Sequence, residues 1–135
     1  MSETLKGRCL CGDVSFEAEP PFLRCVTCHC ESCRRATSAP MAAYFGVDEG
    51  QWRWTGAAPR VFHSTPQVER TFCGRCGSPL SFRSTRPGFS GVIHFYLACL
   101  EDPEALTPES HFFHAEALGW LRLGDDLPRH EGNGA

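Results

Sequence analysis

The chain has 135 residues, 41% of them hydrophobic, and a formal net charge of -3 at pH 7. This length suits one domain, and we predict a single domain over residues 1–135 with its core at about 7–130. The weak negative charge and the lack of a basic run exclude a nucleic-acid footprint and an anionic membrane as partner. No stretch approaches the roughly 20 apolar residues that span a bilayer, and the start has no signal-peptide pattern, so we expect a cytoplasmic protein.

Short segments rich in aromatic and β-branched residues follow one another along the chain, separated by Gly, Pro, Ser and Asp. The alternation of apolar and polar residues in VSFEAE and QWRWTG is typical of half-buried strands with one solvated face. The predicted strands lie at 13–19, 41–47, 51–56, 60–65, 79–84 and 91–100. The predicted fold class is therefore mainly β, built from antiparallel strands.

Helical signals are few. One short helical turn is predicted at 33–38, after a cluster of cysteines. A second is predicted at 102–108, where Asp102 would cap the helix and Pro103 would take its first position. The tail at 129–135 is expected to fray.

Nine cysteines are the strongest chemical signal in this sequence. Their number is odd, there is no export signal, and they come in tight C-x-C and C-x-x-C pairs. In a reducing compartment such pairs bind metal or carry out thiol chemistry, whereas a disulfide framework belongs to secreted chains. We therefore predict metal binding.

Two of the pairs complement each other. Each ends just before a glycine, which permits the tight turn that points backbone N–H groups at thiolate sulfurs. Neither pair can complete a tetrahedron alone, so the two together predict one four-cysteine site, formed by Cys9, Cys11, Cys73 and Cys76. The alternative is two independent redox pairs, although only the second pair has the C-x-x-C spacing of that chemistry.

A second group of cysteines lies at CVTCHCESC, residues 25–33. Cys28, Cys30 and Cys33 can reach one ion, and three protein ligands leave a fourth position for a substrate. Cys25 lies close enough in sequence to fill that position, and local spacing leaves both possibilities open.

The order of the motifs carries a family resemblance. GRCLCGDVSFE, CHCESCRRATS, ERTFCGRCGSPLSF and LEDPEALTPESHFF...GWLRLGDDLPRH resemble the glutathione-dependent formaldehyde-activating enzyme (GFA) family, also called the centromere-protein-V-like group, from about Gly7 to His130. The resemblance implies an Mss4-like, predominantly β fold stapled by zinc knuckles, with two zinc ions per chain. It assigns a structural zinc to Cys9, Cys11, Cys73 and Cys76, and a catalytic zinc with one open position to Cys28, Cys30 and Cys33.

The activity that this resemblance implies is that of a carbon–sulfur lyase. Its substrate would be a small-molecule adduct between glutathione, the thiol co-substrate, and a small aldehyde. Three thiolates on divalent zinc carry a formal charge of about -1, which suits a soft sulfur ligand better than water activation. Cys25 lies outside the family motif, and it is interpreted as a small buried residue, as a fourth ligand that silences the site, or as a nearby thiol that can oxidise against Cys33 or Cys30.

Further candidates surround the second group. Arg34 could hold a carboxylate of glutathione, and Arg35 is a weaker candidate for the same contact. His29 could donate a hydrogen bond behind the ligands or point outward, and His111 could serve either structure or proton transfer. His94 and Cys99 would lie on opposite faces of a strand over 91–100.

Three function classes compete. The first is the zinc lyase, and the second is a non-catalytic zinc-stapled β module that binds a protein or carries metal. They differ in the fourth ligand, because closure by Cys25 would favour the module. The third, a methionine sulfoxide reductase, would need Cys99 as its reactive thiol, but no basic group lies beside it in YLACLED to lower its pKa.

Overall fold

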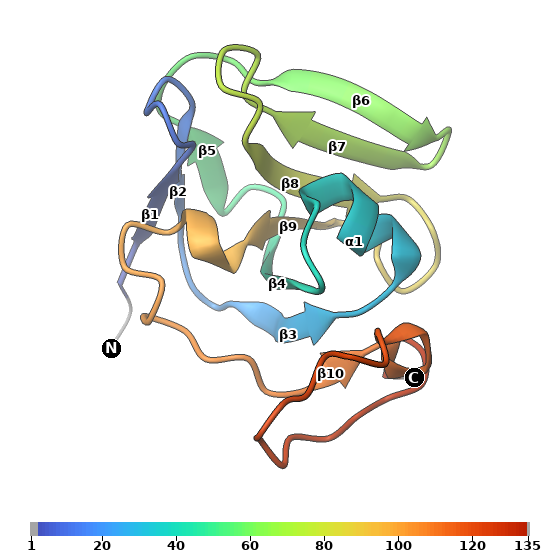
Figure 1. The fold of residues 1–135 in the computed structure, drawn as a ribbon. Helices are drawn as coiled ribbons and strands as arrows, with labels where there is room; N and C mark the ends of the chain where they lie inside the picture. Colours follow the sequence, from blue (N-terminus) through green and yellow to red (C-terminus); the bar gives the residue numbers. More distant parts are fainter. Residues whose placement is uncertain (1–2, 135) are drawn as a thin grey trace.

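A computed structural model describes residues 3–134 and contains two β-sheets (Figure 1). The smaller sheet has the strand order β1-β2-β5, at Leu5–Arg8, Ser15–Ala18 and Trp52–Trp54. The larger sheet has the order β10-β3-β4-β9-β8-β7-β6, at His111–Phe112, Leu23–Cys28, Ala42–Asp48, Val92–Tyr96, Pro79–Ser84, Val68–Phe72 and Arg60–Thr65. The pairings are antiparallel except that of β10 with β3. The predicted mainly β fold class is thus confirmed, while its Mss4-like character stays a prediction.

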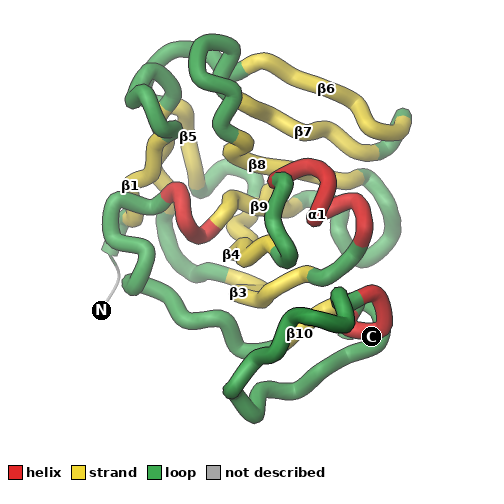
Figure 2. The backbone as a smooth tube through the Cα atoms, viewed as in Figure 1, coloured by secondary structure: helices red, strands yellow, loops and turns green. Residues whose placement is uncertain are grey.

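Helices are few, as expected. One α-helix, α1, covers Glu31–Thr37, and two 3-10 helices, η1 and η2, cover Leu97–Cys99 and His114–Glu116. These segments are red in Figure 2, where green loops account for most of the chain between them and the strands. No helix within residues 3–134 is long and apolar enough to cross a membrane.

The two sheets meet in a core of aromatic side chains. Phe16 on β2 is fully buried and stacks on Phe95 of β9, with ring centroids 4.0 Å apart. Trp54 on β5 closes the same cluster edge-on. Gly7 on β1 lies so close to the Phe16 ring that a Cβ at this position would collide with it. This close approach lets the edge strand of the small sheet lie directly over the core.

A second group of buried residues lies under α1. Its members come from α1 and from strands of the large sheet, and they are Val26, Cys28, Cys33, Ala42, Tyr44, Phe82, Tyr96 and Phe112. In Figure 1, α1 lies in front of this sheet, between the β6–β7 hairpin and the segment that carries β10. The helix therefore covers the part of the core that contains Cys28 and Cys33.

Helix α1 begins and ends through local interactions. Cys30 is its N-cap, and the Cys30 sulfur accepts a hydrogen bond from the backbone N–H of Cys33 at 3.3 Å. Glu31 in the first turn pairs with Arg35 one turn later, at 2.8 Å. The helix ends where Ser38 adopts a left-handed conformation with φ 53°. The helical turn predicted after the cysteine cluster is confirmed, although the helix begins before Cys33.

Each of the six predicted strand segments overlaps a strand, but four strands were not predicted: β1, β3, β7 and β10. The strand over 91–100 ends at Tyr96 and passes into η1, so the alternation of faces does not extend to Cys99. The second predicted helical turn, at 102–108, is wrong. Asp102 does accept a hydrogen bond from Glu104 N–H, at 3.1 Å, but it forms a turn rather than a helix.

The C-terminal segment is tied to the sheet rather than frayed. Its backbone forms two hydrogen bonds with His111 of β10. His111 N–H donates to the Pro128 carbonyl, and His130 N–H donates to the His111 carbonyl, both at 2.8 Å. Phe113 N–H reaches the Gly132 carbonyl at 2.7 Å. This segment, red in Figure 1, pairs with β10 at His111, and β10 pairs with β3, so the segment extends the large sheet beyond β10.

Candidate metal centres and their surroundings

Two loops bring four cysteine sulfurs together at one end of the molecule. Cys9 and Cys11 follow β1, and Cys73 and Cys76 lie between β7 and β8. All four sulfurs lie within 4.8 Å of one another, a spacing that could hold a metal ion. We call this group the four-cysteine set. Because β1 belongs to the small sheet and β7 and β8 to the large one, the set joins the two sheets.

Backbone hydrogen bonds prepare both loops for thiolates. The Cys73 sulfur accepts from Arg75 N–H at 3.3 Å and from Cys76 N–H at 3.4 Å, while Val14 N–H donates to the Cys9 sulfur at 3.4 Å. Gly12 and Gly77 have φ near +80° (85° and 81°), so the tight turns need glycine at these two places. The donor set is all sulfur and is surrounded by N–H groups, which is the environment that soft metal ions require.

Ser78 connects the two loops of the four-cysteine set. Its hydroxyl accepts a hydrogen bond from Leu10 N–H at 3.0 Å and lies 3.2 Å from the Cys76 sulfur. The hydrogen bond from Ser78 lowers the pKa of the Cys76 thiol to about 5. Cys76 is thus prepared as a thiolate, the form that binds metal.

Three further sulfurs gather at the end of β3. Cys28 ends the strand, Cys30 caps α1 and Cys33 lies in its first turn, and their sulfurs lie within 4.8 Å of one another. Cys28 and Cys33 are buried, while Cys30 is partly exposed. Hydrogen bonds from the Cys28 and Cys33 thiols, followed by those from the backbone, strongly lower the pKa of Cys30. We call this group the three-cysteine set.

Cys25 is not a member of either set. Its side chain packs in the core between the sheets, whereas Cys28 and Cys33 belong to the cluster under α1. Burial, followed by the nearby Glu109 carboxylate, raises the pKa of Cys25 to about 11, so this thiol stays protonated. The structure thus places Cys25 as a buried core thiol, the first of the three roles that the sequence left open.

A cavity of about 410 Å³ opens beside the three-cysteine set, and we call it the thiol cavity. All three cysteines line it, together with Tyr44 and Phe82 from the large sheet. Burial, followed by negative charge on the cysteines, raises the pKa of Tyr44, so its hydroxyl stays protonated at this wall. The three sulfurs therefore face a space that can admit a small molecule.

Comparison with known families identifies the chain. A family model described as glutathione-dependent formaldehyde-activating enzyme matches residues 4–116. The chain belongs to the GFA family.

Two relatives of this GFA-family chain add detail. An uncharacterized lyase of Schizosaccharomyces pombe (strain 972) is 34% identical over 82 residues, which cover 59% of this chain and 58% of the relative. The chain thus matches less than two thirds of that relative's length. A crystal structure of a Rhodobacter sphaeroides protein has a TM-score of 0.60 at 23% identity, covering 76% of this chain and 91% of the other. This second likeness is one of fold.

In this GFA-family chain, buried histidines connect the three-cysteine loop to the C-terminal segment. His111 Nε2 lies 3.0 Å from Asp125 Oδ1, and His111 Nδ1 lies 3.1 Å from His29 Nε2. Because the Asp125 carboxylate accepts a hydrogen bond, His111 Nε2 donates to it. His111 Nδ1 faces both His29 Nε2 and the Thr27 hydroxyl oxygen, which lies 2.5 Å away. His29 is fully buried, so its ring points inward against His111. Asp125 was not singled out in the sequence, since no local spacing links it to His29.

Arg34 lies beside the same loop. Arg34 Nε donates to the His29 carbonyl oxygen at 3.2 Å, and Arg34 is not among the residues that line the thiol cavity. Its role as a contact for glutathione stays a prediction. Arg35 pairs with Glu31 instead. Cys99 donates from its sulfur to the Pro79 carbonyl oxygen at 3.3 Å, and burial raises the pKa of Cys99 to about 11, which does not suit a reactive thiol.

His94 gives the GFA-family fold a test of pH dependence. Its ring is fully buried against Phe82, and Nε2 accepts a hydrogen bond from Arg24 at 3.2 Å. Burial, followed by the Arg24 charge, lowers the pKa of His94 to about 3. The His94 ring of the unfolded chain therefore takes up a proton near pH 6.5, whereas that of the folded chain does so only near pH 3. The free energy of unfolding consequently falls as the pH drops from 6.5 toward 3, by about 1.4 kcal/mol per pH unit.

We expect the free energy of unfolding to fall by about 2 kcal/mol from this group between pH 7.5 and pH 5. His94→Gln should show a correspondingly shallower fall. Denaturant titrations of both proteins at the two pH values, with equal metal content checked, measure the difference. An equally steep fall in the variant would show that His94 is not the group responsible. His29, whose pKa is lowered to about 4 chiefly by burial, keeps its contribution in both proteins and cancels.

Proposed function

We propose that this chain is a zinc-dependent carbon–sulfur lyase that acts on adducts between glutathione, or another thiol, and small aldehydes. The observation that carries the proposal is that three cysteine sulfurs line one cavity while Cys25, the nearest further thiol in sequence, lies in another part of the core. Membership of the GFA family and the lyase name of the yeast relative support the reaction class. A single cytoplasmic domain stays the prediction for its organisation.

Two zinc ions per chain belong to the proposal. Cys9, Cys11, Cys73 and Cys76 would hold a structural ion, and Cys28, Cys30 and Cys33 would hold the catalytic one. The all-sulfur donors, the N–H groups around them and the lowered pKa values of Cys30 and Cys76 fit these assignments. When bound at the three-cysteine set, zinc supplies a Lewis acid that prefers a soft thiolate to water, because three thiolates already offset its charge.

The chain's own residues shape the reaction space. Tyr44 and Phe82 give the cavity an aromatic wall beside the three sulfurs. In the synthetic direction a thiolate sulfur forms a bond to the aldehyde carbon, and the carbonyl oxygen takes up one proton. In the lyase direction the hydroxyl gives up that proton as the carbon–sulfur bond breaks. The protonated Tyr44 hydroxyl can donate a hydrogen bond to the oxygen in either direction.

Cobalt substitution tests this function. Zinc is replaced by cobalt in the reduced protein, and the visible spectrum is recorded while glutathione is added. We expect a saturable change from the three-cysteine set and none from the four-cysteine set, whose ligands are complete. The matched control is Cys25→Ser, which should give the same titration, because Cys25 lies outside both sets.

The opposite outcome would favour the second function class. If all cobalt is already in four-sulfur coordination and glutathione changes nothing, the chain is a non-catalytic zinc-stapled module. The position of Cys25 in the core between the sheets is the observation against that class.

A further inference from the structure

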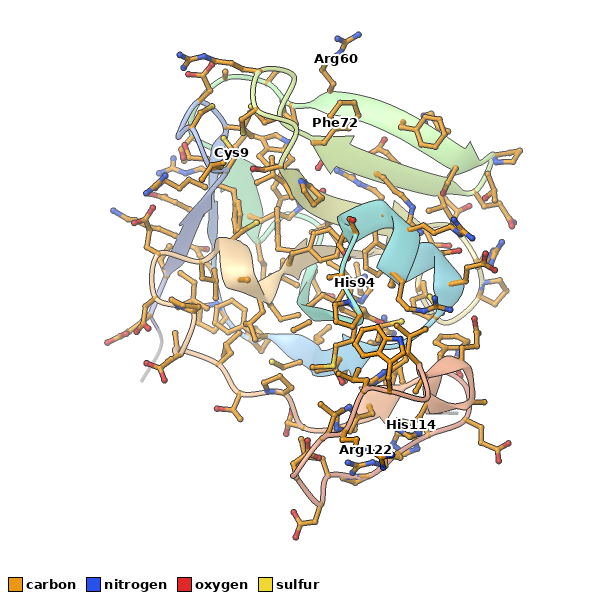
Figure 3. The ribbon with its side chains drawn as sticks, in the orientation of Figure 1. Cys9, Arg60, Phe72, His94, His114 and Arg122 are labelled. Carbon is orange, nitrogen blue, oxygen red and sulfur yellow. The ribbon has the colours of Figure 1, made fainter. Side chains whose placement is uncertain are left out.

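A second cavity adjoins the thiol cavity. It has a volume of about 440 Å³ and lies against the β6–β7 hairpin, where Phe62 and Phe72 line it, so we call it the hairpin cavity. The two cavities share three lining residues, Ser32, Ser64 and Arg70. Figure 3 shows Phe72 on the hairpin above α1, the helix that carries Ser32. The space beside the three-cysteine set therefore continues past Arg70 toward the hairpin, which is room for more than the reacting carbon and sulfur.

Arg70 is held in a fixed orientation at this junction. Arg70 Nε donates to Ser64 Oγ on the neighbouring strand β6, at 3.1 Å. The guanidinium carbon lies over the Phe82 ring of β8, 5.6 Å from its centroid. The hydrogen bond fixes the inner nitrogen of the guanidinium, and the contact with the Phe82 ring fixes the guanidinium plane. A planar donor held in this way is suited to bind a carboxylate through two hydrogen bonds.

The remaining donors of Arg70 lack a matching acid. No ion pair joins Arg70 to a carboxylate within residues 3–134, and its further side-chain partner, the Tyr96 hydroxyl, is neutral and leaves the guanidinium charge unbalanced. The acids of the thiol cavity have other partners: Glu31 pairs with Arg35, and Glu116 accepts from Glu31 N–H at 3.0 Å. A partly buried positive charge without a carboxylate partner is costly, which favours an anion from outside the chain.

We infer that Arg70 binds a carboxylate of the thiol substrate and so selects acidic thiols such as glutathione over neutral ones. This rests on the proposed function, because the three-cysteine set must receive the sulfur of the same molecule. The adduct would lie with its sulfur in the thiol cavity and one carboxylate at the junction of the two cavities. Arg70 thus takes the role that the sequence suggested for Arg34, which is turned toward the His29 carbonyl.

The test compares a ligand with and without its carboxylates. Isothermal titration calorimetry of the metal-loaded protein measures the Kd for S-methylglutathione and for its dimethyl ester. Both ligands are thioethers, so neither carries a free thiol. We expect esterification to weaken binding to the natural protein by about tenfold or more, the loss of a charged hydrogen bond. Arg70→Gln should bind the acid as weakly as the natural protein binds the ester, and should not distinguish the two.

Two further variants separate recognition from fold and from net charge. Arg70→Lys keeps the charge and should recover at least about threefold in affinity for the acid relative to Arg70→Gln. Arg53→Gln removes the same charge from the small sheet, where Arg53 pairs with Glu17 and lines neither cavity, and should change the Kd by less than about threefold. Equal losses in Arg70→Gln and Arg53→Gln, or equal losses in both Arg70 variants, would overturn the inference.

The natural protein itself separates this inference from the proposed function. If it binds the acid and the ester with equal affinity, Arg70 is not a carboxylate site and the lyase proposal stands. If it binds neither, the lyase proposal fails and the inference fails with it.

Discussion

Replacing Cys73 with serine is expected to unfold most of the molecule. Cys73 is fully buried in the four-cysteine set, where its sulfur accepts two backbone hydrogen bonds. The set joins the small sheet to the large one across 62 residues of sequence, from Cys11 to Cys73. Structural zinc sites contribute about 10–16 kcal/mol of apparent binding free energy in zinc-finger peptides, comparable with the whole stability of a domain. Loss of one ligand should therefore cost about 5 kcal/mol or more.

Circular dichroism, denaturant titration and metal analysis measure this effect. We expect the natural protein to contain two zinc ions and the variant to unfold below physiological temperature. Cys25→Ser is the matched control, since it removes a buried sulfur of the same core that belongs to neither set. It should cost about 1–3 kcal/mol, the ordinary penalty for a buried hydroxyl. A cooperatively folded Cys73→Ser protein with two zinc ions would contradict the structural role of the four-cysteine set.

Replacing Cys30 with serine should abolish activity while leaving the fold intact. Serine is a good N-cap, so the hydrogen bond from Cys33 N–H that begins α1 can be kept without the sulfur. Residues that merely support metal ligands already cost about 10–100-fold when mutated, so loss of a ligand should lower kcat/KM by at least about 100-fold. The midpoint of thermal unfolding should move far less than in Cys73→Ser.

Metal analysis and activity on a glutathione–formaldehyde adduct, measured together, check this expectation. We expect one zinc ion per chain in Cys30→Ser, held by the four-cysteine set, against two in the natural protein. Cys25→Ser serves again as control and should retain both ions and most of the activity. Full activity in Cys30→Ser would show that the reaction does not take place at the three-cysteine set.

The sequence predicts both groups of cysteines because ligand pairs lie close together along the chain. Cys73 and Cys76, for example, need only one tight turn to face the same point, and Gly77 marks that turn. What cannot be read locally is that the four-cysteine set joins different sheets. The packing of the small sheet, which contains β1, against the large sheet depends on the contact of Phe16 with Phe95, more than seventy positions away in sequence.

The position of Cys25 illustrates why the rest was not predicted. β3 is missing from the predicted strands, so the argument that residues three apart in a strand lie on opposite faces was not available for Cys25 and Cys28. Arg70 is also missing, since its importance arises only when β6, β7 and β8 bring Ser64 and Phe82 to it. Side-chain directions set by tertiary contacts leave no local signal.

The four-cysteine set also orders events during synthesis. At about 5–20 residues per second, Cys73 leaves the ribosome about 3–12 s after Cys11. Cys28, Cys30 and Cys33 emerge within six residues of one another. The nascent chain therefore exposes all three thiols of the three-cysteine set to cellular zinc and to oxidants before Cys73 and Cys76 are available to Cys9 and Cys11. Under the proposed assignment of the two ions, the ligands of the catalytic one are therefore complete before those of the structural one.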